Sequence, residues 1–307
     1  MPQPSRFPAS PPVPVIPPLR VAVEQFLARA RFSARTRESY AQDFAPVLAR
    51  WGDQPVGRAL TPAVAAAFLA QQEHHAASTY NRRFAALRSL VRWCRTQGWL
   101  ADDPLLGRER RPQPQTPPRA LDPAQVEAVL RGIRDHRDRA LFWLLYDGGL
   151  RAREALAINV DDIDWTERCI VIQGKGERRR ETFFSRRVAG YLATYLKDRG
   201  EPGQGPLFVT QRRARHPRYA DVTAEGYARL SYRQADTRWK TYTPGWDLHQ
   251  LRHTAISARA ARGYTEVELK RFSGHRSLRS LEVYIADNRE AAKRKAREWE
   301  RRTMSDG

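Results

Sequence analysis

The first hundred residues carry apolar positions at the spacing of one helix face. Apolar residues three or four positions apart lie on one side of a helix, and four such stripes follow one another between residues 19 and 103. They predict four helices that share a core. The stripes are Val23, Phe26, Leu27 and Ala30, then Tyr40, Phe44, Val47 and Trp51, then Phe68 and Leu69, and last Phe84, Leu87, Val91 and Cys94.

Proline, glycine and hydroxyl residues mark the ends of these helices. Pro46 lies inside the second stripe, so that helix either bends or ends there, because proline lacks an amide hydrogen and collides with the preceding turn. Thr61 followed by Pro62 is typical of an N-cap and a first helical residue. Ser78 is a candidate cap for the fourth helix, which Gly98 ends.

Proline-rich segments border this helical region. Eight prolines fall within residues 2–18, which predicts an extended, disordered tail over residues 1–18. Proline recurs with arginine and glutamine between residues 104 and 119, a composition that suits neither a helix nor a central strand. We therefore expect a helical domain over residues 19–103, a linker over 104–119 and a second domain over 120–307.

The second domain is predicted to be mainly helical. It opens at Asp122 and Pro123, which suit an N-cap and a first helical turn. Between Arg168 and Phe184, two β-prone runs flank a Gly-Lys-Gly turn and predict an antiparallel hairpin. A charged helix is expected over residues 288–302. The expected fold class is mainly α with a small antiparallel β-sheet, divided into a helical first domain and an α+β second domain.

The chain is strongly basic, with 54 lysines and arginines against 34 aspartates and glutamates and a formal charge of +20. Such a surface attracts phosphates and gains affinity by releasing counterions, so double-stranded DNA is the expected partner. A solvated basic surface is the simpler alternative. The candidate DNA contacts are Arg82, Arg83, Arg88 and Arg92 on the fourth helix and Arg178 and Arg179 in the hairpin.

Cysteine usage and hydropathy exclude several other classes of protein. Cys94 and Cys169 stand apart among apolar residues, which indicates neither a zinc site nor a disulfide. The longest apolar run, from Ala140 to Tyr146, is far shorter than the roughly 20 residues that span a bilayer. The amino terminus lacks the apolar core of a signal peptide. We therefore expect a cytoplasmic protein without a membrane segment, a metal or a cofactor.

Two arginines are candidates for stabilising a reacting phosphate. Attack on a phosphodiester builds negative charge on the non-bridging oxygens, and fixed cationic donors stabilise that charge most in the transition state. Arg151 follows a glycine turn at a predicted helix start, and Arg252 shares a helix face with His249. Arginine suits this task because its fork can bind two oxygens. Glu154, three residues after Arg151, is a candidate for orienting that guanidinium.

Tyr284 is the candidate nucleophile. A tyrosine hydroxyl has an ordinary pKa near 10, so at neutral pH it needs a base or nearby positive charge to ionise. His249 is a candidate carrier of the phenolic proton, His275 a candidate hydrogen-bond donor to the phosphate, and Lys175 a candidate acid for the leaving oxygen. Neither a metal nor ATP is required, because a phosphotyrosyl ester retains the bond energy for the reverse attack.

Each of these residues has a simpler explanation when it is taken alone. His249 and His253 have the spacing of a zinc pair, but no third ligand is placed to complete it. Lys175 lies in a common hairpin turn, and Tyr284 suits a half-buried helix aromatic. His253 is expected to be a structural histidine. The chemical interpretation is specific because the signals occur together and in one order.

In their order along the chain, these motifs resemble those of the tyrosine recombinases, the phage integrase family. They are Gly-Leu-Arg151, Gly-Lys175-Gly, His249-Gln-Leu-Arg252-His, Gly-His275 and Tyr284. The resemblance extends over nearly all of the chain after residue 18, and it implies a helical core-binding domain that clamps DNA followed by a catalytic domain. It also implies that Tyr284 forms a 3′-phosphotyrosyl link and frees a 5′-hydroxyl. Four protomers would then exchange strands through a Holliday junction.

Two departures from the family pattern leave every catalytic group in place. Ser273 stands where the family commonly has leucine before Gly-His, and Asp147-Gly148-Gly149 replaces Thr-Gly before Leu-Arg. Two rival functions remain open: a type IB topoisomerase, which uses similar chemistry on one strand, and a DNA-binding protein that keeps the fold without cutting. The intact set of six polar residues argues against the second rival.

Overall fold

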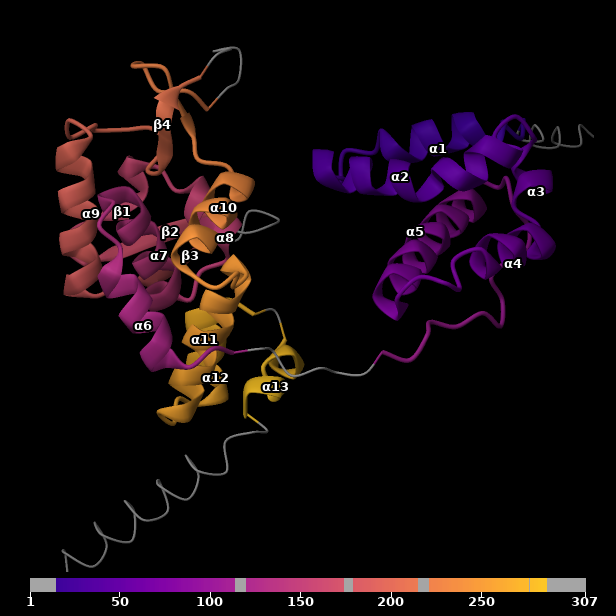
Figure 1. The fold of residues 1–307 in the computed structure, drawn as a ribbon. Coiled ribbons are helices and arrows are strands. Elements are labelled where there is room, and N and C mark those ends of the chain that lie inside the picture. Colours follow the sequence, from indigo (N-terminus) through magenta and orange to yellow (C-terminus); the bar gives the residue numbers. More distant parts are fainter. Residues whose placement is uncertain (1–14, 114–119, 174–178, 215–220, 276, 286–307) are drawn as a thin grey trace, which may run out of the picture. The chain divides into compact units, whose positions relative to one another are not determined.

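The computed structural model describes residues 15–113, 120–173, 179–214, 221–275 and 277–285 (Figure 1). The chain divides into two compact units, Met1–Gln115 and Thr116–Gly307, called here the amino-terminal unit and the carboxyl-terminal unit. Within the described ranges the structure is mostly helical with small antiparallel sheets, which confirms the predicted fold class.

The described part of the amino-terminal unit is helical. Its elements are α1 (Leu19–Leu27), α2 (Ala34–Trp51), α3 (Val56–Ala59), α4 (Pro62–Ala70) and α5 (Ala77–Thr96). Pro46 lies inside α2, so this helix continues past its proline. The hydroxyl of Thr61 caps α4 as predicted. Ser78 does not cap α5, because the helix already begins after Ala76, whose backbone is extended. The single turn of α3 is too short to produce an apolar stripe.

The predicted apolar stripes meet in one core, except that Ala30 lies beyond the end of α1 and is exposed. Each of four helices contributes a phenylalanine that is at most 1% exposed: Phe26, Phe44, Phe68 and Phe84. The rings of Phe26 and Phe44 lie 6.1 Å apart in an edge-to-face arrangement, which aromatic pairs favour. Burial of one such side chain stabilises a fold by about 1.5–3 kcal/mol relative to exposure. The four rings therefore join α1, α2, α4 and α5.

Parts of the predicted tail and linker pack on the amino-terminal unit. The amide of Val56 donates to the carbonyl of Pro17 at 3.0 Å. Arg111 exchanges two hydrogen bonds with the side chain of Asn81, at 2.8 and 2.9 Å. The remainder of both segments, residues 1–14 and 114–119, lies outside the described residues.

Helices also dominate the carboxyl-terminal unit. They are α6 (Pro123–Gly132), α7 (His136–Gly148), α8 (Ala152–Ala157), α9 (Arg186–Asp198), α10 (Tyr232–Tyr242), α11 (Leu248–Ala261), α12 (Glu266–Ser273), α13 (Glu282–Ile285) and the single 3₁₀ turns η1 (Val160–Asp162) and η2 (Leu278–Ser280). Asp122 caps α6 as predicted, accepting from the amide of Ala124. The helix expected over residues 288–302 lies outside the described residues.

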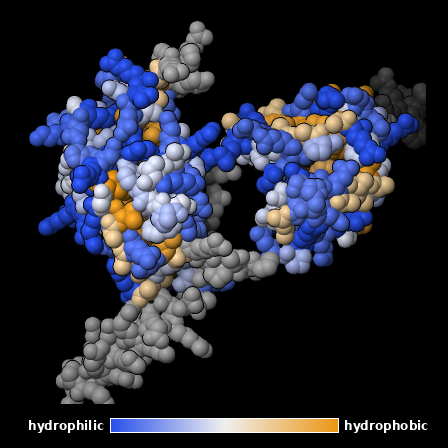
Figure 2. Space-filling view, in the orientation of Figure 1, coloured by the Kyte–Doolittle hydropathy of each residue, from blue (hydrophilic) through white to orange (hydrophobic). Residues whose placement is uncertain are grey.

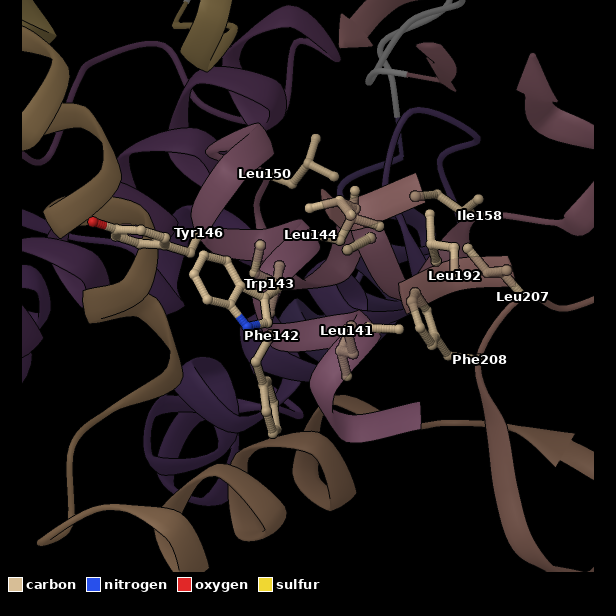
Figure 3. Close-up of a cluster of buried hydrophobic side chains, with 14 of the residues drawn as sticks. Leu141, Phe142, Trp143, Leu144, Tyr146, Leu150, Ile158, Leu192, Leu207 and Phe208 are labelled. Carbon is tan, nitrogen blue, oxygen red and sulfur yellow. The ribbon is translucent and has the colours of Figure 1, made fainter. Parts of the chain in front are cut away.

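Helix α7 is the centre of the carboxyl-terminal unit. It contacts α6, α9, α10 and α11, and its residues from Ala140 to Leu145 are at most 3% exposed. Figure 3 shows part of this cluster of buried side chains. Trp239 of α10 packs against Phe142 with ring centroids 5.0 Å apart. Hydrophilic residues cover most of the visible face around this core (Figure 2). The packing fixes the end of α7, where the candidate site begins.

The described part of the carboxyl-terminal unit contains two small antiparallel sheets. The first joins β1 (Ile163–Asp164), β2 (Cys169–Gln173) and β3 (Arg179–Phe183) in that order, and the second joins β4 (Val209–Arg213) and β5 (Tyr227–Arg229). Ile170 pairs with Thr182, which confirms the predicted hairpin. The second sheet is not evident in the sequence, because the three last residues of β4 are exposed and its register is irregular.

Candidate active site

A glycine turn places Arg151 at the edge of the core. Gly149 ends α7 in the left-handed conformation, with φ 57°, and a Cβ there would come within 2.4 Å of the Phe272 ring. Only glycine therefore fits both the backbone angle and the space. Arg151 then forms the N-cap of α8, as its sequence context predicts.

Glu154 holds Arg151 in place. Its carboxylate accepts from the Arg151 backbone amide at 3.1 Å and from the Arg151 guanidinium at 2.8 Å. A carboxylate in the first turn of a helix also suits the positive end of the helix dipole. These two contacts fix the Arg151 side chain against the first turn of α8.

Arg252 connects three segments from within α11. Its side chain is only 3% exposed and donates to the carbonyl of Gly149 at 2.6 Å and to that of Ser273 at 2.7 Å. Burial, and next the charge of Arg151, lower the pKa of Arg252 to about 10, so it remains protonated at neutral pH. The guanidinium is thus a fixed cation between the α7–α8 turn and the end of α12.

Arg180 of β3 is a site residue that was not singled out from the sequence. It donates to Glu154 at 2.7 Å and to the carbonyl of Phe272 at 3.5 Å. A Cβ on Gly274 would lie 2.6 Å from its Nε atom. Arg180 stands in a run of three arginines, in which only its position on the hairpin distinguishes it from its neighbours. It shares Glu154 with Arg151 and supports the turn that precedes His275.

His275 follows the left-handed Gly274 at the end of α12. Its Nδ1 atom lies 2.6 Å from the Ser273 hydroxyl, and its Nε2 atom lies 3.5 Å from the Arg252 guanidinium. Burial, followed by the charges of Arg252 and Arg151, lowers the pKa of His275 to about 4. The imidazole is therefore neutral at pH 7 in the protein without DNA.

Tyr284 lies on α13 in contact with His253 rather than with the histidine expected from the sequence. Its hydroxyl is 2.5 Å from Nδ1 of His253, and its ring centroid is 6.2 Å from that of His275. His249 is stacked edge-on against His253 at 4.5 Å. The i, i+4 spacing on α11 is the sequence signal for a histidine pair, but it does not reveal which member meets the tyrosine.

The hairpin residues predicted to act at the site are only partly described. Lys175 and Arg178 lie in residues 174–178, outside the described residues, and the side chain of Arg179 is also outside them. The backbones of Gln173 and Arg179 are paired, so residues 174–178 connect the ends of β2 and β3 in the sequence.

Four candidate DNA contacts lie on α5, and two of them bind neighbouring side chains. Arg82 is hydrogen-bonded to the carboxylate of Asp43, which is 2% exposed, and to Ser39 at 3.1 Å. Arg83 is hydrogen-bonded to Gln72 and forms an ion pair with Asp43 at 3.7 Å. These two arginines help to hold α5 against its neighbouring helices.

The other two candidate DNA contacts on α5 line a basic hollow of about 330 Å³ on the amino-terminal unit. Arg88 and Arg92 are exposed there, one helical turn apart. The other arginines of this arginine hollow are Arg29, Arg31 and Arg110. Arg29 has a buried Nη1 atom without a hydrogen-bond partner within the structure. Exposed arginines such as Arg88 and Arg92 in a basic hollow suit a phosphate.

Among the described residues, no group of three or more histidines, cysteines, aspartates or glutamates is placed to hold a metal ion. In the same part of the chain, no helix has the length and apolar content needed to cross a bilayer. Cys94 and Cys169 are both free and buried.

Comparison with other proteins identifies relatives that match about two thirds of the chain. The tyrosine recombinase XerC of Chlamydia trachomatis is 28% identical over 232 residues, which cover 69% of this chain and 68% of that protein. XerC of Lactobacillus delbrueckii subsp. bulgaricus is 25% identical over 227 residues, which cover 70% of this chain and 74% of that protein.

Solved structures share the fold. The Tn1549 transposon integrase in complex with a circular intermediate DNA superposes with a TM-score of 0.66 at 15% identity, covering 92% of this chain and 99% of that one. XerH recombinase bound to a palindromic difH substrate in a post-cleavage complex gives a TM-score of 0.63 at 18% identity, covering 92% and 85%.

The sequence profile of the phage integrase family matches residues 119–291, which is more than half of the 307 residues. The chain therefore belongs to the phage integrase family and is a tyrosine-type site-specific DNA recombinase.

Proposed function

We propose that Tyr284 is the nucleophile of this recombinase and that Arg151, Arg252 and His275 hold the reacting phosphate. The contact that carries the proposal is the hydrogen bond from Tyr284 to His253, which lies one residue after Arg252 on α11. This contact places Tyr284, the proposed nucleophile, beside α11, the helix that carries the buried Arg252. Cations fixed by Glu154 and by backbone carbonyls need little rearrangement when charge develops on the phosphate.

The proposed reaction exchanges one phosphodiester for another. The Tyr284 oxygen attacks the phosphorus, the bond to the 5′-oxygen breaks, and a 3′-phosphotyrosyl ester forms. His249 takes the phenolic proton, and Lys175 gives a proton to the departing 5′-oxygen. A free 5′-hydroxyl then attacks the phosphotyrosyl ester, which restores a DNA strand and releases Tyr284. Each step replaces one phosphoester bond with another, so the reaction runs in both directions.

The proposed assembly contains four protomers on two paired double-stranded sites, which pass through a Holliday junction. The XerH neighbour is described as bound to a palindromic difH substrate in a post-cleavage complex, which supports DNA cleavage by a protein of this fold. We place the protein in the cytoplasm, where it has access to double-stranded DNA. Integration, excision and resolution share this chemistry.

The arginine hollow is proposed to bind the DNA backbone. Arg88 and Arg92 are exposed there and have no carboxylate partner among the described ion pairs, whereas Arg82 and Arg83 are engaged with Asp43. Arg178 and Arg179 are proposed as further phosphate contacts.

The proposed chemistry is tested with protein and its Tyr284→Phe variant mixed with genomic DNA of the source organism. The mixture is denatured with detergent, and DNA ends attached to protein are sequenced. We expect ends at one or a few sites that depend on Tyr284, with DNA binding retained in the variant. Tyr264→Phe, which changes a half-exposed tyrosine before α12, is the matched control and should keep the attachment.

Each outcome decides between the proposed functions. Attachment that survives in Tyr284→Phe would show that another residue is the nucleophile. Ends scattered over the genome, together with relaxation of a plasmid without a site, would favour the type IB topoisomerase. Absence of attachment with tight DNA binding would favour the non-cutting DNA-binding protein.

A further inference from the structure

Ser273 is fully buried at the end of α12, beside the proposed phosphate ligand His275. Its Oγ atom lies 2.6 Å from the carbonyl oxygen of Leu269 and 2.6 Å from Nδ1 of His275. A hydroxyl has a single proton, and a carbonyl can only accept. When Ser273 donates to Leu269, its oxygen accepts a hydrogen bond from His275, and the proton of the neutral imidazole then lies on Nδ1.

Arg252 favours the same form of His275 from the other side of the ring. One of its Nη atoms lies 3.5 Å from Nε2 of His275. A guanidinium nitrogen only donates, so a proton on Nε2 would set two donors against each other, whereas an unprotonated Nε2 accepts. Ser273 and Arg252 are held on different elements, and both favour a proton on Nδ1 and a lone pair on Nε2.

We propose that Ser273 is a positioning residue that holds His275 in the Nδ1–H tautomer, so that His275 donates to the reacting phosphate only after Nε2 takes up a proton. This inference rests on the proposed function, in which His275 meets that phosphate. The proton comes from solvent when the anionic phosphodiester enters, and the N–H bond on Nε2 is the only bond formed. The resulting imidazolium donates from Nδ1 to Ser273 and from Nε2 to a phosphate oxygen.

The charges around His275 make this proton uptake dependent on DNA. Burial is the largest influence, followed by four neighbouring cations or imidazoles, and together they lower the pKa of His275 to about 4. A bound phosphodiester offsets these positive charges and raises the pKa of His275. The titratable and charged groups that face the ring are Arg252 and His253 of α11, Arg151 before α8, Arg180 of β3 and Tyr284 of α13.

Ser273→Ala removes the acceptor from Nδ1 and leaves the Ser273 carbonyl, to which Arg252 binds, in place. In this variant only Arg252 still favours the Nδ1–H form, so the neutral ring carries its proton on Nε2 more readily and can donate to phosphate without further protonation. The wild-type cleavage rate should fall as pH rises through the pKa of His275 in the DNA complex. The variant should lose much less activity over the same alkaline range.

The tautomer is tested first, in the full-length protein without DNA. Long-range ¹⁵N–¹H NMR near neutral pH reports which ring nitrogen carries the proton, and His275→Gln identifies the His275 signals. We expect a proton on Nδ1 in the wild type and a shift towards Nε2–H in Ser273→Ala. A wild-type ring protonated on Nε2 overturns the proposal. Thr194→Val, which removes a comparable hydroxyl bond to the carbonyl four residues earlier, should leave the His275 signals unchanged.

The functional consequence is tested by single-turnover attachment to a duplex that carries a site recovered by end sequencing. Above the pKa of a required acid the rate falls about tenfold per pH unit. We expect this fall across about pH 6 to 9 in the wild type and in Thr194→Val. In Ser273→Ala, the factor by which the rate falls over the same range should be at least ~3-fold smaller. Equal pH profiles overturn the proposal. Failure of the wild type to attach at any pH would contradict the proposed function instead, and the NMR result would still decide the tautomer.

Discussion

The hydroxyl of Tyr284 lies 2.5 Å from Nδ1 of His253, in a pair that is neutral in the protein without DNA. Burial raises the pKa of Tyr284, and burial followed by the charges of His249 and Arg252 lowers the pKa of His253 to about 4. Both shifts move the two pKa values further apart and so oppose transfer of the proton from Tyr284 to His253. The tyrosine therefore donates to His253 without ionising, and the pair is a resting state.

Separate replacement of His253 and His249 should show which histidine only contacts Tyr284 at rest and which one takes its proton. His253→Ala should lower the rate of covalent attachment by no more than about 10-fold, whereas His249→Ala should lower it by about 100-fold or more, as removal of a general base does. Single-turnover attachment on a recovered site measures both. The opposite order would make His253 the proton carrier.

Arg180→Ala should weaken both the fold and the chemistry of the site. It removes the 2.7 Å bond to Glu154, which in turn orients Arg151, and it removes support from the Gly274 turn. The loss of a hydrogen bond to a buried charged group costs about 1.5–3 kcal/mol of unfolding free energy. Urea unfolding measures the first effect and attachment kinetics the second. Unchanged attachment would show that Arg151 keeps its orientation without Arg180.

The same variant has a defined pH dependence. Burial raises the pKa of Glu154, but the charge of Arg180 and the hydrogen bonds from Arg151 outweigh it, so the net pKa is lowered. A carboxylate with a lowered folded pKa contributes stability above its unfolded pKa of about 4.3 and loses that contribution as pH falls through the folded value. The stability difference between wild type and Arg180→Ala should therefore be largest at neutral pH and shrink in acid. An equal difference at pH 7 and in acid would contradict this account.

Gly149→Ala should destabilise the protein, because a Cβ at this left-handed residue collides with Phe272. Strain and overpacking together should cost about 2–5 kcal/mol. Gly190→Ala is the matched control: Gly190 lies inside α9 with nothing within 4 Å of its added Cβ. It should be neutral or stabilising by up to about 1 kcal/mol. Thermal melting of both variants compares them directly, and equal melting temperatures would contradict the predicted clash.

Asp138→Asn should be among the most damaging single changes in the core. Asp138 is fully buried and accepts from Arg137, Arg238 and Tyr242 at 2.6–2.9 Å. Loss of its charge leaves buried Arg137 without compensation, at a cost of about 3–5 kcal/mol. Asp53→Asn breaks an exposed pair with Arg20 and should cost less than about 1 kcal/mol. Chemical denaturation distinguishes the two, and similar losses would contradict a special role for Asp138.

Substitution of Arg88 on α5 should change DNA affinity, whereas substitution of Arg82 on the same helix should change stability. Arg88→Ala should reduce the salt dependence of DNA binding by about one phosphate contact, with little change in unfolding. Arg82→Ala should instead cost about 1–3 kcal/mol of stability, since buried Asp43 loses a donor. Binding measured over a series of salt concentrations, beside urea unfolding, tests both. A normal salt slope in Arg88→Ala would remove the arginine hollow from the DNA interface.

Most of the fold could be predicted from local patterns. Apolar spacing identified the helices around Phe26, Phe44, Phe68 and Phe84, and Thr61 marked a helix start, because these signals act within a few residues. The sheet of β4 and β5 could not be predicted, since its exposed residues have no alternating pattern. The continuation of α2 through Pro46 depends on packing against other helices, which overrides the local cost of proline.

The sequence indicated which residues gather at the candidate site, but of their contacts it indicated little beyond that of Glu154 with Arg151. Motif order selected Arg151, Arg252, His275 and Tyr284, because the chemistry requires cations, a proton carrier and a nucleophile. The choice of His253 over His249 beside Tyr284 depends on where α13 meets α11, which the spacing of residues does not determine. Arg180 was missed because its partner Glu154 is 26 residues away in the chain.

Arg252 donates to the carbonyls of Gly149 and Ser273, so it has a structural role beside its proposed catalytic one. This affects how relatives of this protein can be interpreted. A descendant that lost the ability to cut DNA would still need this arginine to keep α11, the α7–α8 turn and the end of α12 together. Its presence in a related sequence is therefore poor evidence that the relative is an active enzyme. For the same reason, a substitution at Arg252 that abolishes recombination would not by itself distinguish lost catalysis from lost architecture.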